Sequence, residues 1–179
     1  RYPASNIIYN LISSRAVKEV VEESGGSAVR SRVGHSYIKK LMAETNAVFG
    51  GEHSGHFYFR DFWRADSGAL AALHAIAALG ESELSLSELL KPFNRYISSG
   101  EINSTVSDAV AASKSVEDSY SSQAGVTIDH LDGLTVEGPT WWFNLRASNT
   151  EPLLRLNVEA DTKAEMESIR DTLLHSIRS

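Results

Sequence analysis

The segment Arg146-Ala-Ser-Asn-Thr150 places a cation, two hydroxyls and an amide between two strand-like runs. The arginine guanidinium is a planar fork of donors that matches phosphate oxygens, and successive backbone N–H groups in a turn form a concavity that suits an anion. In a chain of net charge −6, such a positive pocket has to be built locally. The pattern predicts a phosphate site made by Arg146, Ser148, Asn149 and Thr150. A plain hairpin turn is the alternative, because serine and asparagine side chains often bond their own backbone.

A second polar segment, Gly50-Gly-Glu-His-Ser-Gly-His56, follows a short apolar run. Its glycines allow a tight loop that a ligand can approach closely, and open α/β sheets bind ligands at the ends of their strands. Glu52 can accept hydrogen bonds from neighbouring hydroxyls, Ser54 can donate or accept one, and His56 titrates near neutral pH. This chemistry favours recognition of sugar hydroxyls. The alternatives are a glycine-rich turn with incidental polar residues, or a metal site, although the spacing gives no common face on which metal ligands would converge.

A third candidate is the segment from Arg32 to Lys39, which contains Gly34-His-Ser36. Ser36 stands at the expected start of a helix, where free backbone N–H groups can hold an anion. Such a serine more often only caps the helix, and a lone histidine such as His35 is more often structural than catalytic. Farther along, Asp61 and Asp66 lie near two arginines and are interpreted as part of a solvated loop.

The first half of the chain alternates strand-like and helical patterns. The nearly continuous apolar run Asn6–Ser13 predicts a strand buried on both faces. Residues 67–79 are apolar nearly all round, which predicts a buried helix. Further strands are expected at 28–33, 47–49 and 57–59, and helices at 15–24 and from Ser36 onward. Alternation at this spacing indicates an α/β fold, here a partial α/β/α domain with a mixed or parallel sheet.

The second half changes to hairpins and amphipathic helices. Asp132-Gly133 between apolar runs is a strong hairpin signal, and Trp141–Arg146 alternates apolar and polar residues as a half-buried strand does. Capping boxes at 85–88 and 162–165 predict helix starts. This half is expected to be a small α+β domain with an antiparallel sheet packed on helices. The polar joint near residue 82 places the boundary between a domain at 1–82 and a domain at 83–179.

Composition narrows the class of protein. The chain of 179 residues has ordinary hydrophobic and charged fractions of 42% and 22%, typical of a globular protein. Its acidic balance argues against a nucleic-acid partner, and it has no run of about 18 apolar residues that would cross a membrane. The absence of cysteine fits a reducing compartment, so we expect a cytoplasmic protein. It begins Arg-Tyr-Pro and is expected to be part of a longer protein.

Taken together, the motifs resemble one family in one order. The series is Gly34-His-Ser36 with Ile38-Lys39, Gly51-Glu-His-Ser-Gly-His56, Gly100-Glu-Ile-Asn103 and Arg146-Ala-Ser-Asn-Thr150. It resembles the phosphohexomutases (phosphomannomutase/phosphoglucomutase family), and looks closest to bacterial members. The resemblance covers essentially the whole chain, as the later part of the family's third domain and its entire fourth domain.

The resemblance implies an isomerase that interconverts hexose 1-phosphates and 6-phosphates through a phosphoserine and a bisphosphate intermediate. It implies sugar binding by Glu52 and Ser54, phosphate binding by the Arg146 segment, and proton-transfer assistance by His35 and His56. The phosphoserine and the Mg²⁺ loop belong to N-terminal domains that have no counterpart in this sequence, so the chain alone is expected to be inactive. A stand-alone sugar-phosphate-binding module is the main alternative, and a purely structural half is another.

Overall fold

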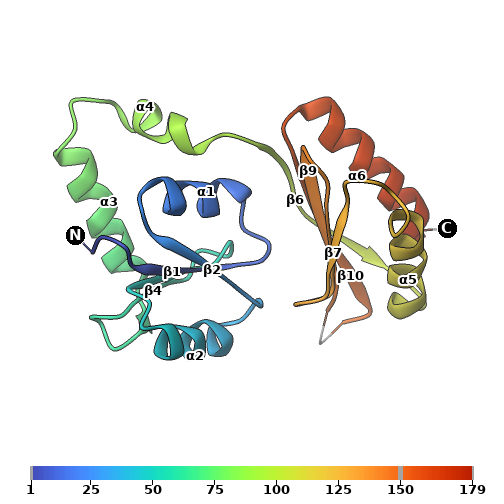
Figure 1. Cartoon of the computed structure of the whole chain (residues 1–179), viewed down its shortest axis with the longest axis horizontal. Helices are drawn as coiled ribbons and strands as arrows, with labels where there is room; N and C mark the ends of the chain where they lie inside the picture. The colour runs from blue at the N-terminus through green and yellow to red at the C-terminus, as the bar shows by residue number, and fades with distance from the viewer. Residues whose placement is uncertain (1, 149–150, 179) are drawn as a thin grey trace. The chain divides into compact units, whose positions relative to one another are not determined.

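The computed structural model describes residues 2–148 and 151–178, and the chain divides into two compact units between Arg95 and Tyr96 (Figure 1). This division falls later than the joint expected at 82/83. Helix α4 (Leu86–Leu90) and the 3₁₀ turn η1 (Lys91–Phe93) lie in the first unit. Ion pairs hold this segment to the first unit. The Arg95 guanidinium, which follows η1, lies 3.0 Å from a carboxylate oxygen of Glu19 and 2.6 Å from one of Glu23.

The first unit is built on a five-stranded mixed sheet in the order β2-β1-β3-β4-β5. Strand β1 pairs in parallel with both β2 and β3, and β4 and β5 continue the sheet antiparallel. Figure 1 shows helices α1 and α2 on opposite faces of this sheet. The element bounds are β1 Asn6–Asn10, α1 Arg15–Glu23, β2 Ser27–Ser31, α2 His35–Thr45, β3 Phe49–Gly51, β4 Phe57–Phe59, β5 Ala65–Asp66 and α3 Gly68–Gly80.

The core of this unit lies between the sheet and α2. Ile8 of β1, Ile38 and Met42 of α2, and Tyr58 of β4 are all at most 1% exposed. A Cβ added to Gly50 would come within 2.8 Å of the Ile38 side chain, so β3 approaches α2 closely at this point. The expected α/β arrangement with a mixed or parallel sheet is confirmed as a mixed sheet, and the last three residues of β1 are buried.

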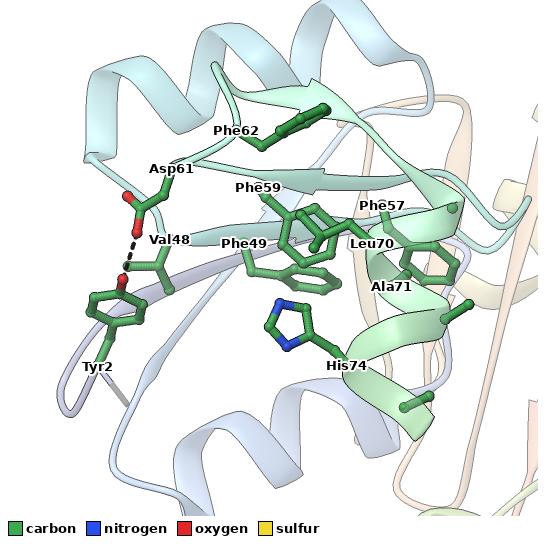
Figure 2. Close-up of a pocket in the computed structure, with 13 residues that line it drawn as sticks. Tyr2, Val48, Phe49, Phe57, Phe59, Asp61, Phe62, Leu70, Ala71 and His74 are labelled. Carbon is green, nitrogen blue, oxygen red and sulfur yellow. Dashed lines mark hydrogen bonds between the residues drawn. The ribbon is translucent and has the colours of Figure 1, made fainter. Parts of the chain in front are cut away.

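Helix α3 departs from the prediction. None of its residues is buried, and Leu73 and Ile76 are 63% and 65% exposed, so the expectation of a buried helix is wrong. One side of α3 does meet the sheet: His74 stacks on Phe59 with ring centroids 5.5 Å apart. Figure 2 shows this side lining an apolar cavity of about 1000 Å³ with Phe49 and Phe57. A helix that is apolar all round is buried only where every face has a partner.

The second unit is an antiparallel five-stranded sheet in the order β6-β10-β9-β8-β7, packed on helices α5 and α6 (Figure 1). The inward residues come from alternate positions of β8, β9 and β10, as the period of a strand requires, and include Phe143, Leu145 and Leu156. The predicted α+β arrangement is confirmed. The bounds are β6 Ile97–Thr105, α5 Ala109–Tyr120, β7 Thr127–Asp129, β8 Leu134–Glu137, β9 Trp141–Ala147, β10 Leu153–Ala160 and α6 Lys163–Arg178.

The two predicted capping boxes differ in the structure. The capping box at 85–88 is complete, with Ser85 accepting from the Glu88 N–H and the Glu88 carboxylate accepting from the Ser85 N–H. At the start of α6 the box is only half formed. Thr162 accepts from the Glu165 N–H, but the Glu165 carboxylate accepts from the Thr140 hydroxyl instead. No helix in residues 2–148 or 151–178 has the length and apolar character that a membrane crossing requires.

Candidate functional site

The loop between β3 and β4 is closed by its own backbone. The Glu52 N–H donates to the His56 carbonyl at 2.9 Å and the Gly55 N–H donates to the Glu52 carbonyl at 3.0 Å. Gly55 has a φ of +85°, a conformation that glycine adopts without strain. The loop is therefore a preformed turn, and it holds Glu52, Ser54 and His56 on one short stretch of backbone.

Glu52 is buried, with only 8% of its surface exposed. One carboxylate oxygen accepts from the Gly34 N–H at 3.2 Å and the other accepts from the Ser54 hydroxyl at 3.2 Å. Gly34 is the N-cap of α2, so the carboxylate satisfies a donor next to the helix start. These bonds hold the carboxylate in one orientation and leave lone pairs for a ligand.

His56 pairs with Asp66 of β5. The His56 Nδ1 lies 2.6 Å from an Asp66 carboxylate oxygen, and the other oxygen accepts from the Phe57 N–H at 2.9 Å. The hydrogen bond and the negative charge of Asp66 raise the pKa of His56, and the same hydrogen bond, with the one from Phe57, lowers the pKa of Asp66. Asp66 is exposed, as expected of a solvated residue, but it lies in β5 and not in a loop, because sequence spacing did not reveal that β5 pairs beside β4.

These side chains meet in one cavity of about 430 Å³. Its lining includes both predicted sugar ligands, both predicted histidines, and Asp66; the residues are Gly34, His35, Lys39, Glu52, Ser54, His56, Tyr58, Ala65 and Asp66. Ser36 does not cap α2 as expected: Gly34 is the N-cap, without a side-chain hydrogen bond. His53 donates its backbone N–H to the Asn10 amide oxygen at 3.3 Å and does not line the cavity.

In the second unit, Arg146 stands one residue before the end of β9. The Ser148 N–H donates to the Leu153 carbonyl at 2.8 Å, which closes the connection to β10. Asn149 and Thr150 lie outside the described residues. Strands β9 and β10 thus form an antiparallel hairpin, and of the predicted phosphate ligands the structure describes Arg146 and Ser148. Their role as phosphate ligands stays a prediction.

Two residues beside Arg146 carried no predicted role. Arg155 of β10 is its cross-strand partner, and Glu101 of β6 reaches both arginines. Glu101 lies 3.3 Å from the Arg155 guanidinium and 3.9 Å from that of Arg146. The two arginines are directly opposed across β9 and β10, where like charges repel, and the Glu101 carboxylate offsets that repulsion. The Gly100-Glu101 motif indicated Glu101, but only the register of three strands shows what it contacts.

The metal alternative for the Glu52 loop gains no support. Within 2–148 and 151–178, no three His, Asp or Glu side chains gather closely enough to hold a metal ion. One carboxylate of the loop is engaged by Gly34 and Ser54, and Nδ1 of His56 is engaged by Asp66. The cavity offers carboxylate, hydroxyl and imidazole groups that can donate or accept hydrogen bonds.

Comparison with known proteins extends over both units. Residues 1–96 match the family model "Phosphoglucomutase/phosphomannomutase, alpha/beta/alpha domain III", and residues 101–176 match "Phosphoglucomutase/phosphomannomutase, C-terminal domain". The phosphomannomutase of Methanocaldococcus jannaschii is 44% identical over 163 residues, which is 91% of this chain and 36% of that protein.

Two solved structures are similar. A phosphoglucomutase/phosphomannomutase family protein of Burkholderia thailandensis has a TM-score of 0.83 and 29% identity over 98% of this chain and 38% of that one. An N-acetylphosphoglucosamine mutase of Aspergillus fumigatus, solved with GlcNAc-6P and magnesium, shares the fold at a TM-score of 0.68 and 13% identity, over 97% of this chain and 38% of that one. The chain thus spans a little over a third of the length of these proteins. On the matches of its two units, the chain belongs to the phosphoglucomutase/phosphomannomutase family.

Proposed function

We propose that this chain supplies sugar and phosphate recognition to a phosphohexomutase that interconverts hexose 1-phosphates and hexose 6-phosphates. The observation that carries the proposal is the cavity in which His35, Glu52, Ser54 and His56 meet. It offers carboxylate and hydroxyl groups for sugar hydroxyls and imidazoles for protons. The Arg146 hairpin of the second unit offers the complementary cation for a phosphate.

In the proposed reaction, a phosphoserine outside this chain donates its phosphoryl group to a free hydroxyl of the hexose monophosphate. The bond from phosphorus to the serine oxygen breaks as the bond to the sugar oxygen forms, and the hydroxyl proton leaves to a base. The bisphosphate then reorients and returns its other phosphate to the serine. The recognition residues must hold the sugar in both orientations, so binding and positioning are their contribution.

Each residue has a role within this scheme. Glu52 accepts hydrogen bonds from sugar hydroxyls, and Ser54, which donates to Glu52, shares that contact. Because Asp66 engages Nδ1 of His56, Nε2 is the nitrogen left to exchange a proton with the substrate. His35 at the start of α2 is the second proton-transfer candidate.

The Arg146 hairpin completes the recognition. The Arg146 guanidinium, with Ser148, Asn149 and Thr150, holds the phosphate that does not react. Its planar fork can engage two phosphate oxygens at once, and the partly buried position of Arg146 beside Glu101 limits its freedom before substrate arrives.

The resemblance also implies Mg²⁺, which we propose is held by N-terminal domains of the same protein. Bound there, the cation would neutralise charge on the transferring phosphoryl group. None of the roles assigned to residues of this chain depends on that ion.

The proposal is tested by comparing this chain with the full-length protein. Supplied with Mg²⁺ and a hexose bisphosphate activator, the full-length protein should interconvert mannose 1-phosphate and mannose 6-phosphate, and this chain alone should not. Turnover by the isolated chain would contradict the proposal that this chain supplies recognition and that the phosphoserine lies outside it. A full-length protein that binds mannose 6-phosphate but carries no phosphoserine by intact mass would support the stand-alone binding module, and one that binds no hexose phosphate would support a structural role.

A further inference from the structure

Tyr58 lies at the centre of β4, with its ring in the core of the first unit. It is 1% exposed, and it packs in the cluster that contains Ile8, Ile38 and Met42. Its cross-strand partner on β3 is Gly50, where α2 approaches the sheet closely. A phenylalanine would satisfy every one of these apolar contacts.

The hydroxyl of Tyr58 is what the packing does not explain. It is buried and has no hydrogen-bond partner among the described residues, yet Tyr58 is one of the residues that line the cavity of Glu52 and His56. A buried polar group without a partner is unfavourable, and buried polar groups are normally satisfied by protein, water or a ligand. No described residue supplies that partner, and the cavity that Tyr58 lines is where a ligand could supply it.

The charges around the cavity define what that partner can be. Burial and the negative charges of Glu52 and Asp66 raise the pKa of Tyr58 to about 12, so its hydroxyl stays protonated and able to donate. Glu52 and Asp66 are acceptors on the same cavity, and His35 and Lys39 of α2 lie on its wall. A ligand hydroxyl that donates its hydrogen bond to Glu52 still has oxygen lone pairs that need a donor.

We propose that Tyr58 is a further sugar-binding residue, whose hydroxyl donates a hydrogen bond to a hydroxyl oxygen of the hexose that Glu52 holds. This inference rests on the proposed function and deepens it. The hexose hydroxyl then receives one bond and gives one, which fixes its direction in the cavity. Substrates that lack this hydroxyl, or carry it in the other configuration, lose the contact.

The test is Tyr58→Phe in the full-length enzyme, which removes one oxygen and keeps the ring. We expect kcat/KM for mannose 6-phosphate to fall about three- to tenfold, the size of one neutral hydrogen bond. The thermal unfolding midpoint should stay the same or rise, because an unsatisfied buried group is gone. Tyr120→Phe on α5, outside this cavity, is the matched control and should leave both quantities unchanged.

Monodeoxy hexose 6-phosphates identify the contact. For the analogue that lacks the contacted hydroxyl, wild type and Tyr58→Phe should have the same kcat/KM, while the other analogues keep the difference. Equal kcat/KM of the two proteins on mannose 6-phosphate would overturn the inference. So would a difference that persists on every analogue, because the hydroxyl would then act on the protein itself. A wild-type enzyme with no activity on hexose phosphates is a separate outcome, which refutes the proposed function and the inference with it.

Discussion

Glu52 and Arg146 are both charged residues withdrawn from solvent, but they are held in different ways. Glu52 is fixed by donors from two segments, the N-cap of α2 and the hydroxyl two residues ahead in its own loop. Arg146 projects from a strand whose neighbours on β10 and β6 place Arg155 and Glu101 beside it. The first site is a turn braced by side-chain hydrogen bonds, and the second depends on the register of a sheet.

The difference predicts how each site fails. A loop held by hydrogen bonds loses individual contacts when one group is changed, and its backbone turn persists because the Glu52–His56 bond is independent of side chains. A site defined by register is sensitive to changes in backbone spacing, since strands transmit a displacement to every residue they pair with. The Glu52 loop should therefore be affected mainly by changes of single side chains. The Arg146 site should also be affected by changes that displace the backbone of its strands.

Removal of the Arg146 guanidinium should have the largest effect on activity. Arg146→Ala in the full-length enzyme is expected to lower kcat/KM about a hundredfold, because a charge-assisted, two-pronged contact with phosphate is lost. Most of the loss should appear in KM, since the distal phosphate is held in ground and transition states alike, with a smaller fall in kcat from poorer positioning.

Arg146→Lys sharpens this result. A point charge cannot reproduce the planar fork, so lysine should recover little of the activity. Arg170→Ala on helix α6, where Arg170 pairs with Asp171, removes the same charge away from the site and is the control. Wild-type binding of hexose phosphate by Arg146→Ala would leave only a hairpin turn at this position.

A backbone change should come next. Gly133 has a φ of +74°, and a Cβ there would lie 2.5 Å from the Leu145 carbonyl oxygen and 3.0 Å from the Arg146 Cα. Gly133→Ala is expected to destabilise the second unit by about 2–3 kcal/mol, from left-handed strain plus overpacking, and to raise KM by displacing Arg146.

Gly125→Ala is the matched control. Gly125 has a similar φ of +78°, but the nearest atom to an added Cβ is 3.9 Å away. It should therefore show the left-handed strain alone. Chemical denaturation of both variants measures the difference, and equal destabilisation would show that the close approach to Arg146 has no energetic role.

In the first unit, loss of the Glu52 charge should cost at most about as much as loss of the Arg146 fork. Glu52→Gln keeps the shape of the side chain but weakens its hydrogen bonds, so a loss of roughly 1.5–3 kcal/mol in transition-state stabilisation is expected. Steady-state kinetics on mannose and glucose phosphates measures it. Glu44→Gln on the exposed side of α2 is the control. Unchanged kcat/KM for both sugars would reduce the loop to a structural turn.

The smallest expected effect is a shift in pH dependence. Asp66→Asn weakens the hydrogen bond and removes the negative charge that together raise the pKa of His56. The His56 pKa, followed by NMR of the labelled full-length protein, should fall, and the acid limb of kcat should move to lower pH with it. KM should change little. Asp61→Asn, a neighbouring exposed aspartate outside the cavity, should move neither quantity. A limb that stays in place while the His56 pKa falls would mean that another group titrates.

The same pair affects stability with a defined sign. The His56 pKa is raised in the folded state, so its contribution is complete below its ordinary value of 6.5 and is lost as the pH rises through the raised value. The Asp66 pKa is lowered, so its contribution is present above 3.8 and is lost as the pH falls through the lowered value. In Asp66→Asn the unfolding midpoint should therefore depend less on pH in both ranges.

The residue pattern was enough to predict most of the helices and strands, and to identify the side chains that could bind a ligand or transfer a proton. Capping at Ser85 and the hairpin at Gly133 depend on short-range spacing, and the structure agrees with each. Helix α3 was predicted less well, because apolar composition tells which faces avoid water but not whether a partner lies opposite.

For function, the sequence by itself determined the family's motifs, the presence of Glu52, His56 and Arg146, and the two-part organisation. Only the tertiary structure decided which groups meet. Asp66 reaches His56 because β5 pairs beside β4, Glu101 reaches Arg146 and Arg155 because three strands share a register, and the Tyr58 hydroxyl lacks a described partner because its ring is packed in the core. These contacts join residues far apart along the chain or on different strands. Local spacing specifies the turns and helices of each segment, whereas the packing of segments against one another specifies their neighbours.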